Sequence, residues 1–82
     1  MREFTYDDLN KIMQEAGGLA ELTEEAGRTA FADLGYDSLA VLEIAARIGQ
    51  QFPVHLPDEV VDRLTSPSIT VTIVNDMLTS EA

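Results

Sequence analysis

The stretch from residue 38 to 51 constrains the fold of this chain most, because apolar residues would cover most of its circumference as a helix. Its apolar positions form two faces at helical spacing. They are Val41, Ile44, Ala45, Ile48 and Phe52 on one face, and Leu39, Leu42, Ala46 and Gly49 on the other. The polar residues Glu43, Arg47 and Gln50 leave only a narrow hydrated stripe. The pattern predicts a central helix that other elements cover on more than one side.

The length of 82 residues allows one small domain, which usually needs compact helix packing, a metal or disulfides for stability. The chain has no Cys, so disulfides are excluded, and a single His argues against a structural zinc site. Packed apolar side chains must therefore stabilise the fold, and a hydrophobic fraction of 45% is sufficient for that. We predict one all-α domain over residues 1–82, without a metal site.

A first helix is predicted over residues 5–16. Thr5 is a suitable N-cap, and Asp8 three residues later completes an approximate capping box. Phe4 before the cap and Leu9 after it fit a hydrophobic staple. Gly17-Gly18 is expected to end this helix.

A long connection over residues 17–37 follows, and a connection of this length in a small domain needs a reason. We expect Leu22, Phe31 and Leu34 to dock on the helices and to hold the connection in place, with a short helical turn inside it. Gly35 then permits a turn that a side chain would hinder.

A short helix over residues 57–63 is predicted after the central one. Pro57 is expected at its first position, and Asp58 and Glu59 follow in the first turn, where the helix dipole favours acidic residues.

Ser66-Pro67 is expected to open the last helix in the same way. Residues 69–74 create a conflict, because every one of them is β-branched and their polarity alternates as in a strand. We nevertheless predict a helix, since a lone strand would have no partner in this chain. Ile69, Ile73 and Met77 also align at helical spacing.

Acidic residues dominate the charge of the chain, with 15 Asp and Glu against 5 Lys and Arg and a net charge of −10. Binding of phosphates requires Lys and Arg, so the charge argues against nucleic acid and anionic membranes as partners and favours basic protein surfaces. The first five residues, MREFT, lack the apolar region of a signal peptide, and no apolar run is long enough to span a membrane. We expect a cytoplasmic protein.

Ser38 stands between the polar connection and the central helix, directly after Asp37. One interpretation is a helix N-cap, the commonest role of serine at a helix start, for which Asp37 is equally suitable. A hydrolase nucleophile is poorly supported, because Gly-x-Ser-x-Gly is absent and His55 is the only imidazole available as a base. A third interpretation is a phosphate ester, which the free N–H groups and the dipole of a helix N-terminus favour.

The segment 34–40, LGYDSLA, resembles the phosphopantetheine attachment motif of acyl carrier proteins, whose kernel is Asp-Ser-Leu. The order and spacing of the predicted elements are similar to that family over nearly the whole chain. Segment 35–40, followed by EIAAR at 43–47, resembles the carriers of bacterial type II (aromatic) polyketide synthases. Fatty-acid carriers more usually have Ala before the Asp and an acidic residue after the Leu, where this chain has Tyr36 and Ala40. The alternatives are a fatty-acid or peptidyl carrier, and an unmodified acidic helical interaction module.

The resemblance implies a small four-helix bundle of the acyl-carrier type, with three longer helices, a short third helix and a long loop between helices one and two. It implies that a phosphopantetheinyl transferase attaches 4′-phosphopantetheine from coenzyme A to Ser38, and that this arm carries malonyl and growing polyketide chains as thioesters. The carrier itself would have no catalytic residue. The implied partners are a ketosynthase with its chain-length factor, a malonyl acyltransferase, and a ketoreductase or cyclases. We expect a monomer.

The resemblance also gives candidate roles to residues near Ser38. Partner recognition is expected of Asp37, Leu39, Glu43, Asp58, Glu59 and Asp62. A possible acyl pocket would be lined by Leu42, Ala45, Ala46, Val61, Leu64 and Val74. Arg47 is expected to pair with Glu43 one turn earlier, Asn75 to be exposed, and His55 to have no chemical role.

Overall fold

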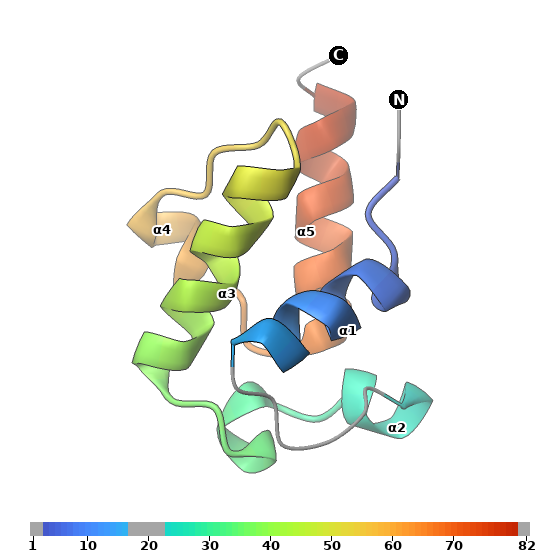
Figure 1. Cartoon of the computed structure of the whole chain (residues 1–82), viewed down its shortest axis with the longest axis vertical. Coiled ribbons are helices and arrows are strands. Elements are labelled where there is room, and N and C mark those ends of the chain that lie inside the picture. The colour runs from blue at the N-terminus through green and yellow to red at the C-terminus, as the bar shows by residue number, and fades with distance from the viewer. Residues whose placement is uncertain (1–2, 17–22, 81–82) are drawn as a thin grey trace.

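The computed structural model of the chain describes residues 3–16 and 23–80, and Figure 1 shows that its ordered elements are all helical. They are α1 (Tyr6–Glu15), α2 (Glu24–Gly27), the 3-10 helix η1 (Phe31–Leu34), α3 (Ser38–Gln51), α4 (Asp58–Val61) and α5 (Pro67–Ser80). No strand occurs in these two ranges. The predicted all-α class is therefore confirmed. None of the helices in this part of the chain combines the length and the apolar character needed to cross a bilayer.

The start of α1 follows from the predicted capping box. The Asp8 N–H donates to Thr5 Oγ1 at 3.2 Å, and the Thr5 N–H donates to Asp8 Oδ2 at 3.0 Å. Phe4 and Leu9, the predicted staple, are 1% and 0% exposed and belong to the same core. Local hydrogen bonds and apolar burial thus fix the same helix start.

The connection between α1 and α3 contains two short helical elements, α2 and η1. Thr23 caps α2, because its side chain accepts from the Ala26 N–H at 3.0 Å. Phe31 is 2% exposed, and the half-buried Leu34 packs against the core, as predicted. Leu22 and the predicted stop at Gly17-Gly18 lie outside the described residues. The connection is therefore held by its own side chains from residue 23 onward.

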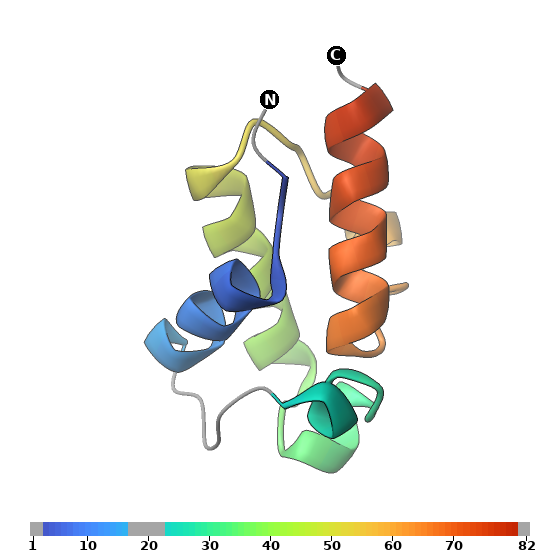
Figure 2. The same cartoon turned by 90° about the vertical axis from the view of Figure 1, so that its right-hand side faces the viewer.

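The helix α3 has the predicted bounds, and Figure 1 shows α1 and α4 on opposite sides of it. Figure 2 shows α1 crossing in front of α3. The buried residues of α3 are Val41, Ile44, Ala45 and Ile48. Its second apolar face is largely uncovered, since Leu39 and Leu42 are 76% and 46% exposed and Ala46 and Gly49 are also exposed. The prediction of a central helix that other elements cover on more than one side is confirmed by its contacts with α1 and α4, although this second apolar face stays largely exposed.

The helix α4 is shorter than the predicted 57–63. Pro57 is its N-cap and not its first helical residue, since its backbone is extended with ψ of 164°. After Val61 the chain continues in tighter turns, in which the Arg63 N–H donates to the Val60 carbonyl and the Leu64 N–H to the Val61 carbonyl. None of the four helical residues is buried, so little packing energy extends the helix in either direction.

The helix α5 resolves the conflict in residues 69–74 in favour of a helix, as predicted. Ser66 caps it, because Ser66 Oγ accepts from the Ile69 N–H at 3.3 Å. The Thr70 hydroxyl donates to the Ser66 carbonyl at 2.9 Å, and the Thr72 hydroxyl donates to the Ser68 carbonyl at 3.1 Å. These bonds, one turn back along the helix, satisfy the threonine hydroxyls. Burial of Val74 and Leu78 in the core stabilises this β-branched segment as a helix.

Asn75 on α5 holds the segment that leads into α1. The Phe4 N–H donates to Asn75 Oδ1 at 2.8 Å, and Asn75 Nδ2 donates to the Phe4 carbonyl at 2.9 Å. Asn75 is half-buried, so the prediction that it is exposed was wrong. The physical reason is that the polar backbone of a buried Phe4 needs hydrogen-bond partners at this position.

Candidate functional site

The turn into α3 depends on Gly35, which has a left-handed backbone with φ of 89° at the end of η1. Its N–H donates to the Ala32 carbonyl at 3.2 Å, and the next N–H, of Tyr36, donates to the Phe31 carbonyl at 2.9 Å. A residue with a side chain would be strained in this conformation. Gly35 therefore directs the chain from η1 toward the first turn of α3.

Substitution Gly35→Ala should lower the free energy of unfolding by about 1–2 kcal/mol, the cost of a left-handed conformation for a residue with a side chain. Urea denaturation followed by circular dichroism would measure it. Gly49→Ala is the matched control, because Gly49 lies within α3 and an added methyl would be 3.4 Å from the Val54 carbonyl oxygen, an ordinary contact. The control should gain up to about 1 kcal/mol of helix propensity. Equal changes in both variants would contradict the role of Gly35.

The aromatic pair Phe31 and Tyr36 packs beneath the turn at Gly35 and helps to hold it in place. Phe31 and Tyr36 are 2% and 6% exposed, and their rings meet edge to face with centroids 5.8 Å apart. The Phe31 N–H also donates to the Thr65 carbonyl at 2.9 Å, which joins η1 to the segment between α4 and α5. The position of residues 36–38 is thus fixed by packing and by a long-range backbone bond.

Asp37, and not Ser38, caps α3. The Asp37 backbone is extended, and its Oδ1 accepts from the Ala40 N–H at 2.8 Å. Ser38 is the first residue of the helix and is exposed. The interpretation of Ser38 as the N-cap was therefore wrong, and its hydroxyl is free of that role.

The surroundings of Ser38 suit a phosphate ester better than a nucleophile that acts on a substrate. The first N–H groups of a helix have no partner within it, and the helix dipole places partial positive charge there. The single imidazole of the chain, His55, lies beyond the other end of α3, a helix of 14 residues or roughly 20 Å. The geometry gives Ser38 no histidine base, which removes the support for a serine hydrolase.

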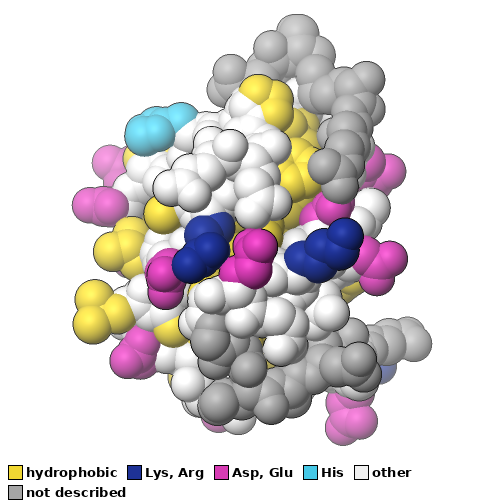
Figure 3. All heavy atoms as spheres, in the orientation of Figure 1, with side chains coloured by type: hydrophobic (Ala, Val, Ile, Leu, Met, Phe, Trp, Pro, Cys, Tyr) yellow, Lys and Arg dark blue, Asp and Glu magenta, His cyan; other side chains and the backbone are white. Residues whose placement is uncertain are grey.

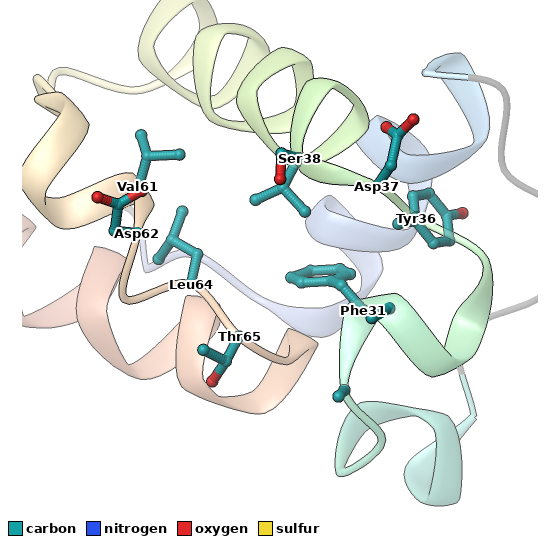
Figure 4. Close-up of a pocket in the computed structure, with 11 residues that line it drawn as sticks. Phe31, Tyr36, Asp37, Ser38, Val61, Asp62, Leu64 and Thr65 are labelled. Atoms are coloured by element: carbon teal, nitrogen blue, oxygen red, sulfur yellow. The ribbon is translucent and has the colours of Figure 1, made fainter.

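A cavity of about 460 Å³ opens beside Ser38. Figure 4 shows Phe31, Val61 and Leu64 around the space next to Ser38, whereas the Tyr36 hydroxyl points away from it. The full lining is Ala30, Phe31, Ala32, Tyr36, Asp37, Ser38, Val41, Val61, Asp62, Leu64 and Thr65. The floor is apolar, and two carboxylates lie at the edges.

A smaller cavity of about 300 Å³ lies farther along α3, between that helix and the segment 54–56. Its lining is Leu42, Ala45, Ala46, Gly49, Val54, His55 and Leu56. The predicted pocket residues are thus divided between two places. Val61 and Leu64 line the larger cavity, and Leu42, Ala45 and Ala46 line the smaller one. Val74 is fully buried in the core and lines neither of these two cavities.

Sequence reasoning missed several residues of the larger cavity, notably Val41, Tyr36 and Thr65. Val41 had a usable signal, since it follows Ser38 by three positions and therefore lies on the same side of the helix. Tyr36 had a weaker signal, as a large ring two residues from Ser38. Thr65 had no signal in the sequence, because the hydrogen bond from the Phe31 N–H to its carbonyl brings it to the cavity.

The residues predicted for partner recognition are all exposed. They are Asp37, Leu39, Glu43, Asp58, Glu59 and Asp62. In Figure 3, acidic and apolar side chains lie close together along the left edge of the molecule, over α3 and α4. The predicted pair of Arg47 and Glu43 is confirmed at 3.3 Å, and Arg47 also reaches Glu15 on α1 at 3.8 Å.

Comparison with known proteins identifies the family of the chain. Residues 10–72 match the family model described as the phosphopantetheine attachment site. The chain is 36% identical to the actinorhodin polyketide synthase acyl carrier protein of Streptomyces coelicolor, over 95% of this chain and 94% of that protein. It is 35% identical to the oxytetracycline polyketide synthase acyl carrier protein of Streptomyces rimosus, over 96% and 86% of the two chains.

Solved structures of polyketide synthase acyl carrier proteins are similar to this chain over nearly its whole length. The actinorhodin holo acyl carrier protein from S. coelicolor has a TM-score of 0.86 at 33% identity, with 99% of this chain and 98% of that one covered. The solution structure of the oxytetracycline acyl carrier protein has a TM-score of 0.84 at 34% identity, with 100% and 90% covered. With the family match, the fold and the exposed serine at the head of α3, the chain belongs to the acyl carrier proteins of type II polyketide synthases, which bear a covalent 4′-phosphopantetheine.

Proposed function

We propose that Ser38 is the attachment residue for 4′-phosphopantetheine, and that the chain, as a single domain, presents malonyl and growing polyketide chains to separate synthase enzymes. One observation carries the proposal: Asp37 caps α3, which leaves the Ser38 hydroxyl exposed and free at the helix N-terminus. The match to the attachment-site family over residues 10–72 includes this serine and supports the same choice.

The attachment reaction would use the Ser38 hydroxyl as the acceptor. A phosphopantetheinyl transferase would form the bond between Ser38 Oγ and the phosphorus of coenzyme A that bears the pantetheine. The bond from that phosphorus to adenosine 3′,5′-bisphosphate breaks, and the hydroxyl proton leaves to a base of the transferase. The free N–H groups at the head of α3 would then stabilise the phosphodiester by about 0.3–1 kcal/mol.

The residues of this chain would hold and present the group without catalysing a reaction. The bound group supplies a thiol for thioester formation, which this chain lacks because it has no Cys. Gly35, Asp37 and the Phe31–Tyr36 pair fix the orientation of the first turn of α3, and therefore the direction in which Ser38 points. Tethering raises the effective concentration of a carried chain at each enzyme.

The exposed residues near Ser38 would form the surface that partners recognise. Leu39 is 76% exposed one position after Ser38, and the acidic residues Glu43 of α3 and Asp58 and Glu59 of α4 are exposed as well. We expect these acidic residues to pair with basic patches of the transferase, the ketosynthase with its chain-length factor, the malonyl acyltransferase, and a ketoreductase or cyclases. Exposed ion pairs contribute only about 0–1 kcal/mol each, so they would raise the encounter rate and still allow release. We propose a cytoplasmic monomer.

The two cavities beside α3 would receive part of an acyl chain. The larger one begins at Ser38, and the smaller one is reached farther along the same helix. Both have apolar walls made by α3 residues, namely Val41 in the first and Leu42, Ala45 and Ala46 in the second. Burial of apolar carbons there is favoured by roughly 0.8 kcal/mol for each CH₂ group.

Incubation with coenzyme A and a broad-specificity phosphopantetheinyl transferase, followed by intact-mass spectrometry, tests the attachment. The expected result is a mass gain of one phosphopantetheine, located on Ser38 by peptide fragmentation. A fatty-acid carrier processed in the same tube shows that the transferase is active. Absence of a gain under those conditions, or a gain on another residue, would contradict the proposal and favour an unmodified interaction module.

A further inference from the structure

We propose that Asn75 is a positioning residue for the smaller cavity beside α3, and that it acts through Phe4 and Phe52 on the segment that forms one wall. Asn75 does not line that cavity. This role of Asn75 concerns the cavity itself and does not depend on which residue carries phosphopantetheine. From its position on α5, Asn75 determines how readily uncharged apolar groups enter the space beside α3.

The first step is the contact between Asn75 and Phe4. The two polar atoms of the Asn75 amide bind both backbone groups of Phe4, at 2.8 and 2.9 Å, as a neighbouring strand would. The two residues lie 71 positions apart, so this pair fixes the segment before α1 against α5. The backbone of Phe4 cannot move without loss of these hydrogen bonds.

The second step is the contact between Phe4 and Phe52. Phe4 is 1% exposed, and its ring meets the Phe52 ring at a centroid distance of 5.0 Å and an interplanar angle of 84°. Edge-to-face contacts of this kind have a preferred geometry, and buried rings have little freedom to shift. Phe52 is the C-cap of α3, so the position of Phe4 fixes the point where the chain leaves that helix.

The third step joins Phe52 to the cavity wall. The Val54 N–H donates to the Phe52 carbonyl at 2.7 Å, so Val54 follows any displacement of Phe52. The Val54 carbonyl faces α3, since a methyl group at Gly49 would be in ordinary contact with its oxygen at 3.4 Å. Val54, with the two residues after it, forms the wall opposite Leu42, Ala45 and Ala46. The width of the cavity therefore depends on where Phe52 is held.

The lining indicates which ligands this wall admits. The smaller cavity contains no Asp, Glu, Lys or Arg, whereas Asp37 and Asp62 lie at the larger one. Its walls are aliphatic apart from Gly49 and from His55, which lies in the segment after α3. Xenon is a suitable probe because it is uncharged and enters apolar cavities. It can be used on the protein that carries no phosphopantetheine.

Amide hydrogen exchange and xenon titration, both followed by NMR on the complete chain, test the proposal. In Asn75→Ala, exchange of the Val54 N–H should become at least about tenfold faster, because the variant loses both hydrogen bonds that hold Phe4. Xenon-induced shifts at Ala45, Ala46 and Gly49 should change, while those at Val41 and Leu64 in the larger cavity should remain.

Control variants separate this role from general destabilisation. Phe52→Leu keeps the hydrogen bonds of Asn75 but removes the ring contact, and it should give the same pattern even if Asn75→Ala does not fold. Ile12→Val perturbs the core and should accelerate exchange at Val54 and at Ile44 to similar extents. The proposal is overturned if the Asn75 and Phe52 variants also accelerate both amides equally, or if xenon shifts in the smaller cavity are unchanged.

Discussion

Substitution Ser38→Ala should abolish the gain of one phosphopantetheine completely, while the fold is retained. The loss is total because the variant has no oxygen to form the bond to phosphorus. The fold is retained because Ser38 is exposed and the cap bond comes from Asp37, so the free energy of unfolding should change by no more than about 0.5 kcal/mol. Intact-mass spectrometry measures the modification, and urea denaturation measures the stability.

Ser68→Ala is the matched control for this experiment. Ser68 also lies in the first turn of a helix, α5, but it is half-buried and its Oγ lies 3.2 Å from Ser66 Oγ. The Ser68 variant should be modified as fully as the natural chain. A modified Ser38 variant would show that another residue is the acceptor. An unfolded Ser38 variant would show that Ser38 stabilises the fold, in contradiction to its exposed position.

The sequence predicted the helix α3 and the exposed segment at its head because the strongest signals there are local. The bounds of α3 follow from its apolar pattern and from Pro53, and the Asp37-Ser38-Leu39 segment at its head is visible without a structure. The choice between Asp37 and Ser38 as cap was not predictable, since both are good N-caps and helix boundaries are uncertain by a residue or two. In the structure the extended backbone of Asp37 makes it the N-cap, and the Ser38 hydroxyl is therefore not used as a cap.

The features that sequence reasoning missed arise from contacts between distant parts of the chain. Asn75 was expected to be exposed because α5 alone does not reveal that Phe4 needs partners there. The division of the pocket into two cavities depends on how the segment 54–56 lies over α3. The short α4 is a related case, since its sequence is compatible with more helical residues than its packing stabilises.

Substitution Ile44→Ala should lower the free energy of unfolding by about 2–5 kcal/mol, the range for large-to-small changes in a packed core. Ile44 is 0% exposed in the middle of α3, so alanine removes apolar contacts and leaves a cavity that its neighbours only partly fill. A small domain is stable by only about 5–15 kcal/mol in total, and this loss is therefore a large fraction of its stability. The urea midpoint should fall strongly, with little change in the slope of the transition.

Leu42→Ala is the matched control on the same helix, because Leu42 is 46% exposed and lies on the uncovered face of α3. Its loss of stability should be less than half of that of Ile44→Ala, since truncation of a half-exposed side chain removes less buried area. Similar losses in both variants would show that the second apolar face is covered in solution, in contradiction to the structure. The comparison bears on function, because an uncovered Leu42 remains available to the smaller cavity and to partners, whereas Ile44 serves the core alone.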